Sequence, residues 1–165
     1  MESSLSEIAA PEPSGPRRHI QISWDEIQQD AARLAVMLAA HGETWEGIVA
    51  VARGGLVPAA LIARALDIRR VEAISVAAYE GDRLSPPTLV KHPAAAGDGT
   101  GWLIVDDLVD TGTTMIFVRD LLPKAEVAVL YAKPSGRALA DFHVREFPQD
   151  SWINFPWEMA AAPGR

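Results

Sequence analysis

The sequence has 165 residues, a net charge of −7 and no cysteine. A chain of this length is expected to form a single domain that buries about 70% of its unfolded surface. The absence of cysteine excludes disulfides, thiol catalysis and thiolate metal sites, and the acidic balance argues against a nucleic-acid partner, whose phosphates require clustered lysine and arginine.

The sequence also argues against a zinc site, a membrane span and a signal peptide. The four histidines are scattered without the spacing of zinc ligands, and no stretch approaches the roughly 20 apolar residues of a membrane span. Residues 1–16 are rich in serine, glutamate and proline and lack the apolar core of a signal peptide. We therefore expect a disordered tail over residues 1–18, one domain over residues 19–165, and a cytoplasmic protein.

The first half of the domain is predicted to alternate helices and strands. Ser23-Trp24-Asp25-Glu26 has the S-x-x-E form of a capping box, and apolar residues then recur at helical spacing up to His41. The short apolar runs that follow are typical of strands buried on both faces, as in parallel sheets. A glycine loop and a helix with an early proline lie between them, which predicts a right-handed βαβ unit. The expected elements are a helix over residues 24–41, a strand over 47–52, a helix over 58–66 and a strand over 71–77.

The second half is predicted to contain a long loop followed by another βαβ unit. Prolines and glycines interrupt residues 79–101, which are expected to form a lid, a binding loop or a disordered segment, with room for a short hairpin. A strand over 102–105, a helix over 113–122 and a strand over 127–132 follow. The last aromatic residues lie among prolines and indicate a packed cap without regular structure. The two units together predict an α/β fold with a mostly parallel sheet.

Three groups of polar residues follow the predicted strands: Arg53-Gly54-Gly55, Asp106 to Thr114, and Lys133. Ligands of open parallel sheets bind outside the carboxyl ends of the strands, so these groups are expected at one site. Glycines let backbone N–H groups approach an anion while arginine adds a bidentate fork, although the same residues also suit a tight turn. Taken alone, Lys133 is consistent with an exposed strand end and Trp152 with a core residue.

Residues 102–114 carry the most chemical information. An apolar strand is followed by three carboxylates, Asp106, Asp107 and Asp110, and then by small residues that can open a helix. The carboxylates would repel a phosphate, whereas the amides of residues 111–114 would attract one. A ligand that uses both parts needs hydroxyls or a metal at one end and a phosphate at the other, as in a phosphorylated sugar. Nucleotides and phosphoacceptor chemistry stay open, but the P-loop motif is absent.

The same residues resemble a known family. Residues 102–114 resemble the phosphoribosyl-pyrophosphate (PRPP) binding signature of type I phosphoribosyltransferases. Four blocks together are similar to the bacterial purine phosphoribosyltransferases that act on xanthine and guanine, and the similarity covers about Ile20 to Met159. The blocks are residues 51–58, 106–111, 132–134 and 148–153.

The resemblance implies both a fold and a reaction. The fold is the type I phosphoribosyltransferase fold, a Rossmann-like, mostly parallel central sheet flanked by helices, with a small hood formed by the C-terminal segment and a flexible loop over the active site. The reaction transfers 5-phosphoribose from PRPP to N9 of guanine, xanthine or hypoxanthine, giving GMP, XMP or IMP and pyrophosphate. Two alternatives remain: a non-catalytic PRPP-binding regulator of the same fold, and a phosphoribosyltransferase with another base acceptor.

For PRPP, the resemblance implies three contact regions and a cofactor. Asp106 and Asp107 would bond the ribose hydroxyls, with Asp107 as the contact to Mg²⁺. Pyrophosphate would be held by Arg53 and Gly54, where similar enzymes carry a non-proline cis peptide, and by a loop arginine, for which Arg83 is the choice. The residues that would hold the 5-phosphate are Asp110, Thr111, Gly112, Thr113 and Thr114.

For the purine, the resemblance implies a general base, a cation and a stacking residue. Asp110 would accept the N7 proton as N9 attacks. Lys133 would donate to O6, which adenine lacks. Trp152 would stack on the ring, and the Ile153 carbonyl would accept from N1 or from the 2-position.

Some positions depart from the family pattern. Asn154 stands where an acid is expected, which leaves Glu158 as the acid on this side of the purine site. Similar enzymes are homotetramers, and some rest against the inner face of the cell membrane. A homo-oligomer with at most peripheral membrane association is therefore implied, with PRPP and 6-oxopurine bases as its ligands and no nucleic-acid partner.

Overall fold

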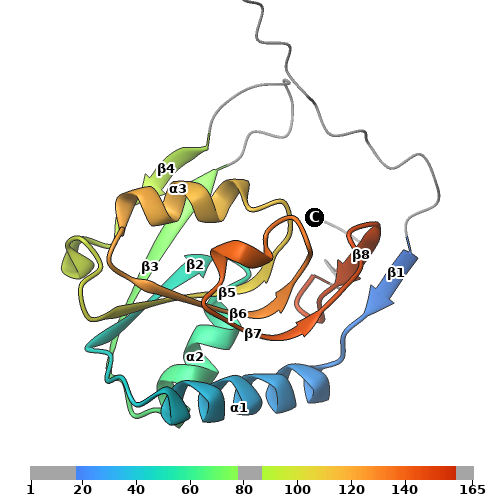
Figure 1. Cartoon of the computed structure of the whole chain (residues 1–165), viewed down its shortest axis with the longest axis horizontal. Helices are drawn as coiled ribbons and strands as arrows, with labels where there is room; N and C mark the ends of the chain where they lie inside the picture. The colour runs from blue at the N-terminus through green and yellow to red at the C-terminus, as the bar shows by residue number, and fades with distance from the viewer. Residues whose placement is uncertain (1–17, 78–86, 159–165) are drawn as a thin grey trace, which may run out of the picture.

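The computed structural model describes residues 18–77 and 87–158, which form an α/β domain (Figure 1). The helices are α1 (Trp24–His41), α2 (Leu56–Ala65) and α3 (Thr113–Leu121), with 3-10 turns η1 (Ala94–Ala96) and η2 (Arg137–Leu139). The strands are β1 (Arg18–Gln21), β2 (Gly47–Ala52), β3 (Arg70–Ala77), β4 (Thr88–Lys91), β5 (Trp102–Val109), β6 (Glu126–Ala132), β7 (Phe142–Glu146) and β8 (Ser151–Asn154).

A six-stranded sheet forms the centre of the described domain, in the order β4-β3-β2-β5-β6-β7. Its neighbours are parallel except for β3 and β4. Helices α1 and α2 cover one face of the sheet, and α3 covers the other. This is the mostly parallel, helix-flanked sheet that the sequence predicted.

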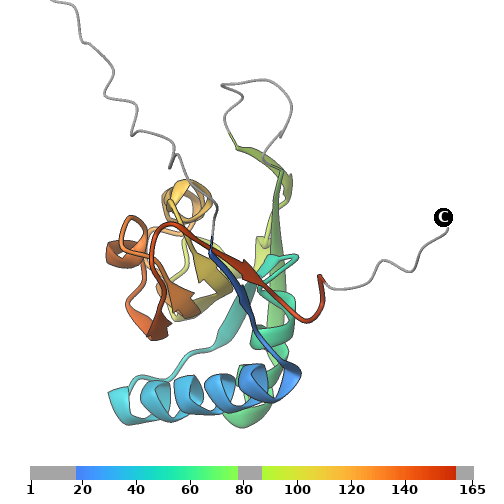
Figure 2. The same ribbon diagram turned by 90° about the vertical axis from the view of Figure 1, so that its right-hand side faces the viewer.

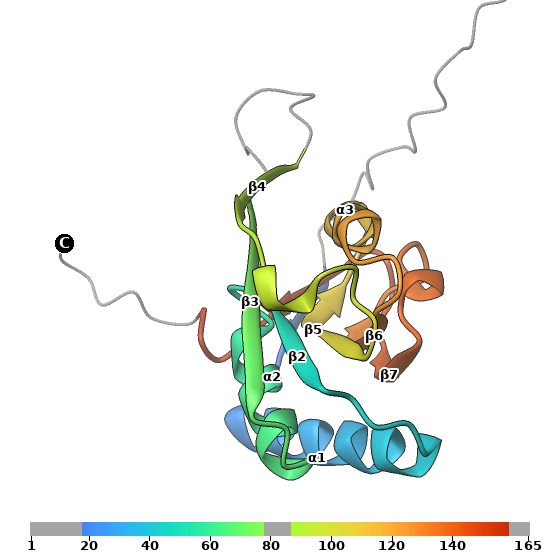
Figure 3. The same ribbon diagram turned by 90° about the vertical axis from the view of Figure 1, so that its left-hand side faces the viewer.

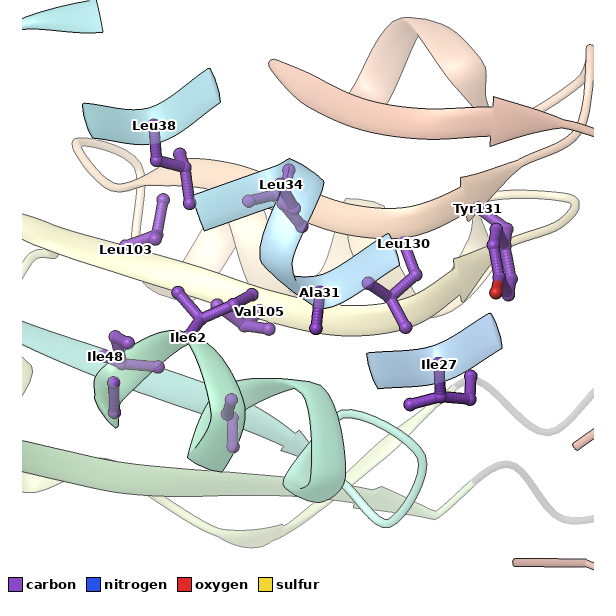
Figure 4. Close-up of a cluster of buried hydrophobic side chains, with 14 of the residues drawn as sticks. Ile27, Ala31, Leu34, Leu38, Ile48, Ile62, Leu103, Val105, Leu130 and Tyr131 are labelled. Carbon is purple, nitrogen blue, oxygen red and sulfur yellow. The ribbon is translucent and has the colours of Figure 1, made fainter. Parts of the chain in front are cut away.

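The central strands are buried on both faces because helices pack on each side of them. In β5, Leu103 and Val105 belong to the apolar cluster beneath α1 and α2, whereas Ile104 belongs to the cluster beneath α3. Figure 4 shows the first cluster, in which Leu34 of α1 and Ile62 of α2 meet the sheet. The continuous apolar runs of the sequence are therefore strands of a parallel sheet.

Helix α1 has the boundaries predicted from the sequence. The Ser23 hydroxyl accepts the Glu26 N–H at 3.2 Å, and the Glu26 carboxylate accepts the Ser23 N–H at 2.9 Å, which completes the capping box. Gly42 ends the helix with a φ of +84°, a conformation that favours glycine. Strand β2 also has its predicted bounds, and the other predicted elements before Lys133, apart from β5, differ from the observed ones by one or two residues at an end.

Strand β5 is longer than predicted. It was expected to end at Val105 but continues to Val109, so Asp106 and Asp107 are strand residues. Its first half pairs with both β2 and β6, and its second half pairs with β6 alone. Backbone pairing with β6 continues where the apolar side-chain pattern stops. The two carboxylates therefore project from a hydrogen-bonded strand and not from a loop.

The prediction that the C-terminal segment lacks regular structure was wrong. Strand β7 forms the edge of the main sheet beside β6. Strand β8 pairs in parallel with β1 in a separate two-stranded sheet (Figure 2). Strand formation depends on partners as much as on local preference, and the partner of β8 lies at the other end of the described chain.

Two predictions fall wholly or partly outside the described residues. Within the predicted loop over residues 79–101, β4 pairs antiparallel with β3, which precedes the loop, so only one strand of this pair lies in the loop itself (Figure 3). Residues 78–86, among them Arg83, lie outside the described ranges. So do residues 1–17, which are most of the predicted tail. Arg18, which was assigned to the tail, is the first residue of β1.

A buried polar cluster joins α1 to β6 and β7. Asp30 of α1 is 1% exposed and accepts the Tyr131 hydroxyl at 2.8 Å and Arg33 Nη1 at 2.9 Å. Arg145 Nε lies 3.0 Å from the same carboxylate, and its guanidinium lies over the Tyr131 ring. Burial, with the Asp30 charge adding to it, raises the pKa of Tyr131. The phenol is thus held in its neutral, donating form.

Replacing Tyr131 by phenylalanine is expected to lower the free energy of unfolding at pH 7 by about 1–3 kcal/mol, because Asp30 loses a donor that water cannot replace. The native phenol has a raised pKa, so its contribution is fully present below the unfolded value of about 10 and is lost as the pH rises above it. Urea unfolding at several pH values measures both effects. Equal stability of the two proteins at pH 7, or a difference that widens above pH 10, would contradict this role.

Candidate functional site

A cleft of about 1130 Å³ lies at the carboxyl ends of β2 and β5. Two of the three groups predicted from the sequence to share one site line it: Arg53 and Gly54 after β2, and Asp106 to Thr114 at the end of β5 and the start of α3. The third, Lys133, is not among the lining residues. The C-terminal segment adds Trp157 and Glu158. Of these lining residues, Trp157 is one that the sequence analysis did not assign to the site.

Asp106 and Asp107 form an acidic pair in β5, in which Asp106 is buried and Asp107 is partly buried. Asp106 is 8% exposed, and its Oδ1 accepts the Asp107 backbone N–H at 2.8 Å. Burial, and next the neighbouring charge of Asp107, raise the pKa of Asp106 well above its usual range. Burial raises the pKa of Asp107 to about 6, and the charge of Glu158 contributes in the same direction. Such carboxylates favour a ligand that brings positive charge or hydroxyl donors.

The turn after β2 approaches the acidic pair so closely that its first glycine has no room for a side chain. A Cβ on Gly54 would collide with the Asp107 carboxylate. The Ala52–Arg53 peptide bond is cis, as the resemblance implied. The Arg53-Gly54 turn, which suits an anion, therefore lies directly beside the carboxylates, which suit a cation or hydroxyls.

The first turn of α3 faces the same cleft with backbone N–H groups. Its N-cap is Gly112, with a φ of +91° and no side-chain cap. Gly112 O accepts the Ile116 N–H at 2.8 Å, whereas the earlier N–H groups of a helix have no intrahelical partner. The Thr111 and Thr113 hydroxyls lie 3.2 Å apart at this end. Amides and hydroxyls at a helix N-terminus suit a phosphate.

Asp110 is held by two side chains from distant parts of the sequence. Lys133, which is 3% exposed, donates to Asp110 Oδ2 at 2.6 Å and to the Ser151 carbonyl at 2.7 Å. Gln149 donates from Nε2 to Asp110 Oδ1 at 2.7 Å. An ammonium group has three N–H bonds, and these two contacts use two of them. The sequence analysis did not single out Gln149, because a lone glutamine carries no local signal of such a contact.

The predicted purine contacts lie beside the cleft. Trp152 is 45% exposed and Ile153 is 5% exposed, and neither they nor Lys133 are among the residues that line it. The bond from Lys133 to the Ser151 carbonyl nevertheless joins β8 to Asp110, which does line the cleft. Strand β8 thus lies next to the end of the cleft at which Asp110 is found.

Asn154, which stands where an acid was expected, pairs with the first strand. Its Nδ2 lies 3.3 Å from His19 Nδ1, and its backbone is paired with Gln21. The Asn154 side chain therefore has a partner within the β1/β8 sheet. This contact gives it a structural role in holding the two strands together.

An aromatic stack leads from the core to the cleft. Tyr131 stacks on Phe155 with ring centroids 6.0 Å apart, and Phe155 stacks on Trp157 at 4.7 Å. Trp157 also contacts Trp24 of α1 at 5.9 Å. The next residue, Glu158, is the one whose charge raises the Asp107 pKa. The stack therefore fixes the segment that brings this third acid to the acidic pair.

Within residues 18–77 and 87–158, no group of three or more histidine, aspartate or glutamate side chains could hold a metal ion by itself. In the same ranges, no helix is long and apolar enough to cross a membrane.

Comparisons with known proteins agree on one family. The model of the phosphoribosyl transferase domain matches residues 23–163. Xanthine-guanine phosphoribosyltransferases of Cereibacter sphaeroides and Gluconobacter oxydans are each 49% identical to the chain, over 84% of its length and over 86% and 84% of their own. The structure of a purine phosphoribosyltransferase from Pyrococcus horikoshii has a TM-score of 0.74 at 27% identity, covering 89% of this chain and 99% of that one.

Proposed function

Because this chain belongs to the phosphoribosyl transferase domain family, we propose that it transfers 5-phosphoribose from PRPP to N9 of guanine, xanthine or hypoxanthine. It is a transferase of purine salvage that releases pyrophosphate and forms a nucleoside monophosphate. The observation that carries the proposal is the cleft itself. It joins an acidic pair, a glycine turn with arginine and an uncapped helix N-terminus around Asp110.

PRPP fits the cleft by matching each of its parts to a chemically suitable group. Its ribose hydroxyls can donate to Asp106 and Asp107, whose raised pKa values reflect their burial in the free protein. Its 5-phosphate suits the first turn of α3. Its pyrophosphate suits Arg53 and the backbone of Gly54, which already lie beside Asp107. Arg83, the proposed loop contact to pyrophosphate, lies outside the described residues.

Mg²⁺ fits the carboxylates of this cleft. It is commonly bound through one or two carboxylates together with substrate phosphates and water, and the described residues offer the Asp106 and Asp107 pair but no complete protein cage. We assign the metal contact to Asp107, because it is the carboxylate that faces the Gly54 turn. When bound, Mg²⁺ would supply positive charge against the departing pyrophosphate.

In the reaction, N9 of the purine forms a bond to C1 of the ribose as the bond from C1 to pyrophosphate breaks. Asp110 takes the proton from N7, while Arg53 neutralises the charge that gathers on pyrophosphate. Lys133 directs its remaining N–H bond to O6 of the purine. Trp152 stacks on the ring, and the Ile153 carbonyl accepts from N1 or the 2-position. An adenine amino group would meet the Lys133 ammonium with donors only, so adenine is disfavoured.

The proposal is tested by an assay of the purified protein with PRPP and Mg²⁺ against guanine, xanthine, hypoxanthine and adenine, with pyrophosphate release as the readout. We expect turnover with the three oxopurines and little with adenine. PRPP binding by calorimetry without turnover of any base would indicate a non-catalytic regulator. Absence of PRPP binding in the presence of Mg²⁺ would reject the proposal as a whole.

For the oligomeric state and the cellular location, this proposal relies on the resemblance to similar enzymes alone. A homotetramer in the cytoplasm, with at most peripheral membrane contact, stays a prediction of the sequence. Light scattering of the purified protein measures the first, and fractionation of cells measures the second.

A further inference from the structure

Gln149 joins parts of the site that come from three separate segments. Its amide nitrogen donates to Asp110 Oδ1 at 2.7 Å, and its amide oxygen accepts the Ser135 backbone N–H at 2.9 Å. A carboxylate oxygen can only accept and a backbone N–H can only donate. One orientation of the amide therefore satisfies both partners, and the two bonds hold this exposed side chain in place.

With the contact from Gln149, both oxygens of the Asp110 carboxylate accept a hydrogen bond. Oδ2 accepts from the buried Lys133 ammonium at 2.6 Å, and Lys133 is itself anchored by the Ser151 carbonyl. With Lys133 alone, the carboxylate could turn about its last side-chain torsion, which is soft at an sp² carbon. Gln149 removes that freedom. Each carboxylate oxygen has two lone pairs, so a position remains for a proton from the purine.

We infer that Gln149 is a positioning residue, which orients the Asp110 carboxylate for proton transfer without touching the substrate; this inference rests on the proposed function. A general base must lie within hydrogen-bond reach of the proton that it takes, and a misplacement of about 1 Å can cost about 100-fold in rate. A neutral amide suits this task, because it donates a hydrogen bond to the carboxylate without adding a charge beside it.

A pair of substitutions separates this role from a simple brace of the loop at Ser135. Gln149→Glu keeps an oxygen that can accept the Ser135 N–H but replaces the donor to Asp110 with a second carboxylate. Gln149→Ala removes both contacts. We expect each variant to lower kcat with guanine by about 10- to 100-fold, with Gln149→Glu at least as impaired as Gln149→Ala. The dissociation constant of PRPP, measured by calorimetry, and the thermal unfolding midpoint should stay at their wild-type values.

Gln28→Ala is the matched control, because Gln28 lies on the exposed face of α1, and it should keep the wild-type kcat. A Gln149→Glu enzyme with wild-type kcat would overturn the inference, since the brace to Ser135 would then be all that Gln149 supplies. A higher KM for guanine at unchanged kcat would also overturn it, because Gln149 would then act in base binding. If the wild-type protein is inactive with every purine, the proposed function is rejected and the inference about Gln149 falls with it. If the wild-type protein is active, the variants test the inference by itself.

Discussion

Replacing Asp110 by asparagine is expected to lower the turnover number with guanine by about 10²- to 10⁴-fold, which is the usual contribution of a general base. Asparagine keeps the size of the side chain but cannot take the N7 proton. It also has a single acceptor oxygen, so the Lys133 ammonium or the Gln149 amide would face an NH₂ group. The affinity for PRPP should change little, because the acidic pair and the Arg53 turn are untouched.

Steady-state kinetics and calorimetry with PRPP test the two halves of this prediction. Asp120→Asn is the matched control, since it makes the same chemical change at an exposed position of α3. It should leave both measurements unchanged. Unaltered turnover of the Asp110→Asn enzyme would remove Asp110 from the role of general base, whatever the control shows.

Replacing Lys133 by alanine is expected to weaken the recognition of 6-oxopurines and to narrow the preference for guanine over adenine. A hydrogen bond from a charged donor contributes about 1.5–3 kcal/mol, so kcat/KM for guanine should fall by about 10- to 100-fold. One part of the loss comes from the missing bond to O6. The other part arises because Asp110 and the Ser151 carbonyl lose the ammonium group that they share. Adenine should be affected less, because it gains nothing from the ammonium.

The measurement is kcat/KM for guanine and adenine with the same enzyme preparations. Lys124→Ala is the matched control, because Lys124 forms an exposed ion pair with Asp98 at 2.9 Å, and such pairs contribute little. A Lys133→Ala enzyme with the wild-type ratio of guanine to adenine would contradict the assignment of Lys133 to O6.

The elements that could be predicted from the sequence are those whose cause is local. The capping box that defines the start of α1 is contained in four consecutive residues, Ser23 to Glu26. The apolar runs likewise predict strands that lie between two layers of helices. The extension of β5 through Asp106 and Asp107 could not be predicted in this way. It depends on pairing with β6, which side-chain hydrophobicity does not report. The pairing of β8 with β1 was missed for the same reason.

The same distinction applies to the candidate site, where some residues could be predicted from the sequence and others could not. Arg53, Asp107 and Thr111 were predicted to share a site because each follows or ends a parallel strand, and they do line one cleft. Gln149 and Trp157 were missed, because their roles arise from contacts with residues distant along the chain. Motifs report residues that touch the ligand, while the residues that hold those in place come from the packing of the whole domain.

The pairing of β1 with β8 has a consequence for how the protein is made. Residues Arg18–Gln21 are synthesised long before their partners Ser151–Asn154. Bringing β1 and β8 together closes a long loop, which costs conformational entropy before the contacts between the strands can offset it. Contacts between residues so distant along the chain slow folding. Strands β2 and β5, with the acidic pair and the start of α3, precede β8 in the chain. The segments proposed to hold PRPP, residues 53–54 and 106–114, are therefore synthesised before the strand proposed to choose the base.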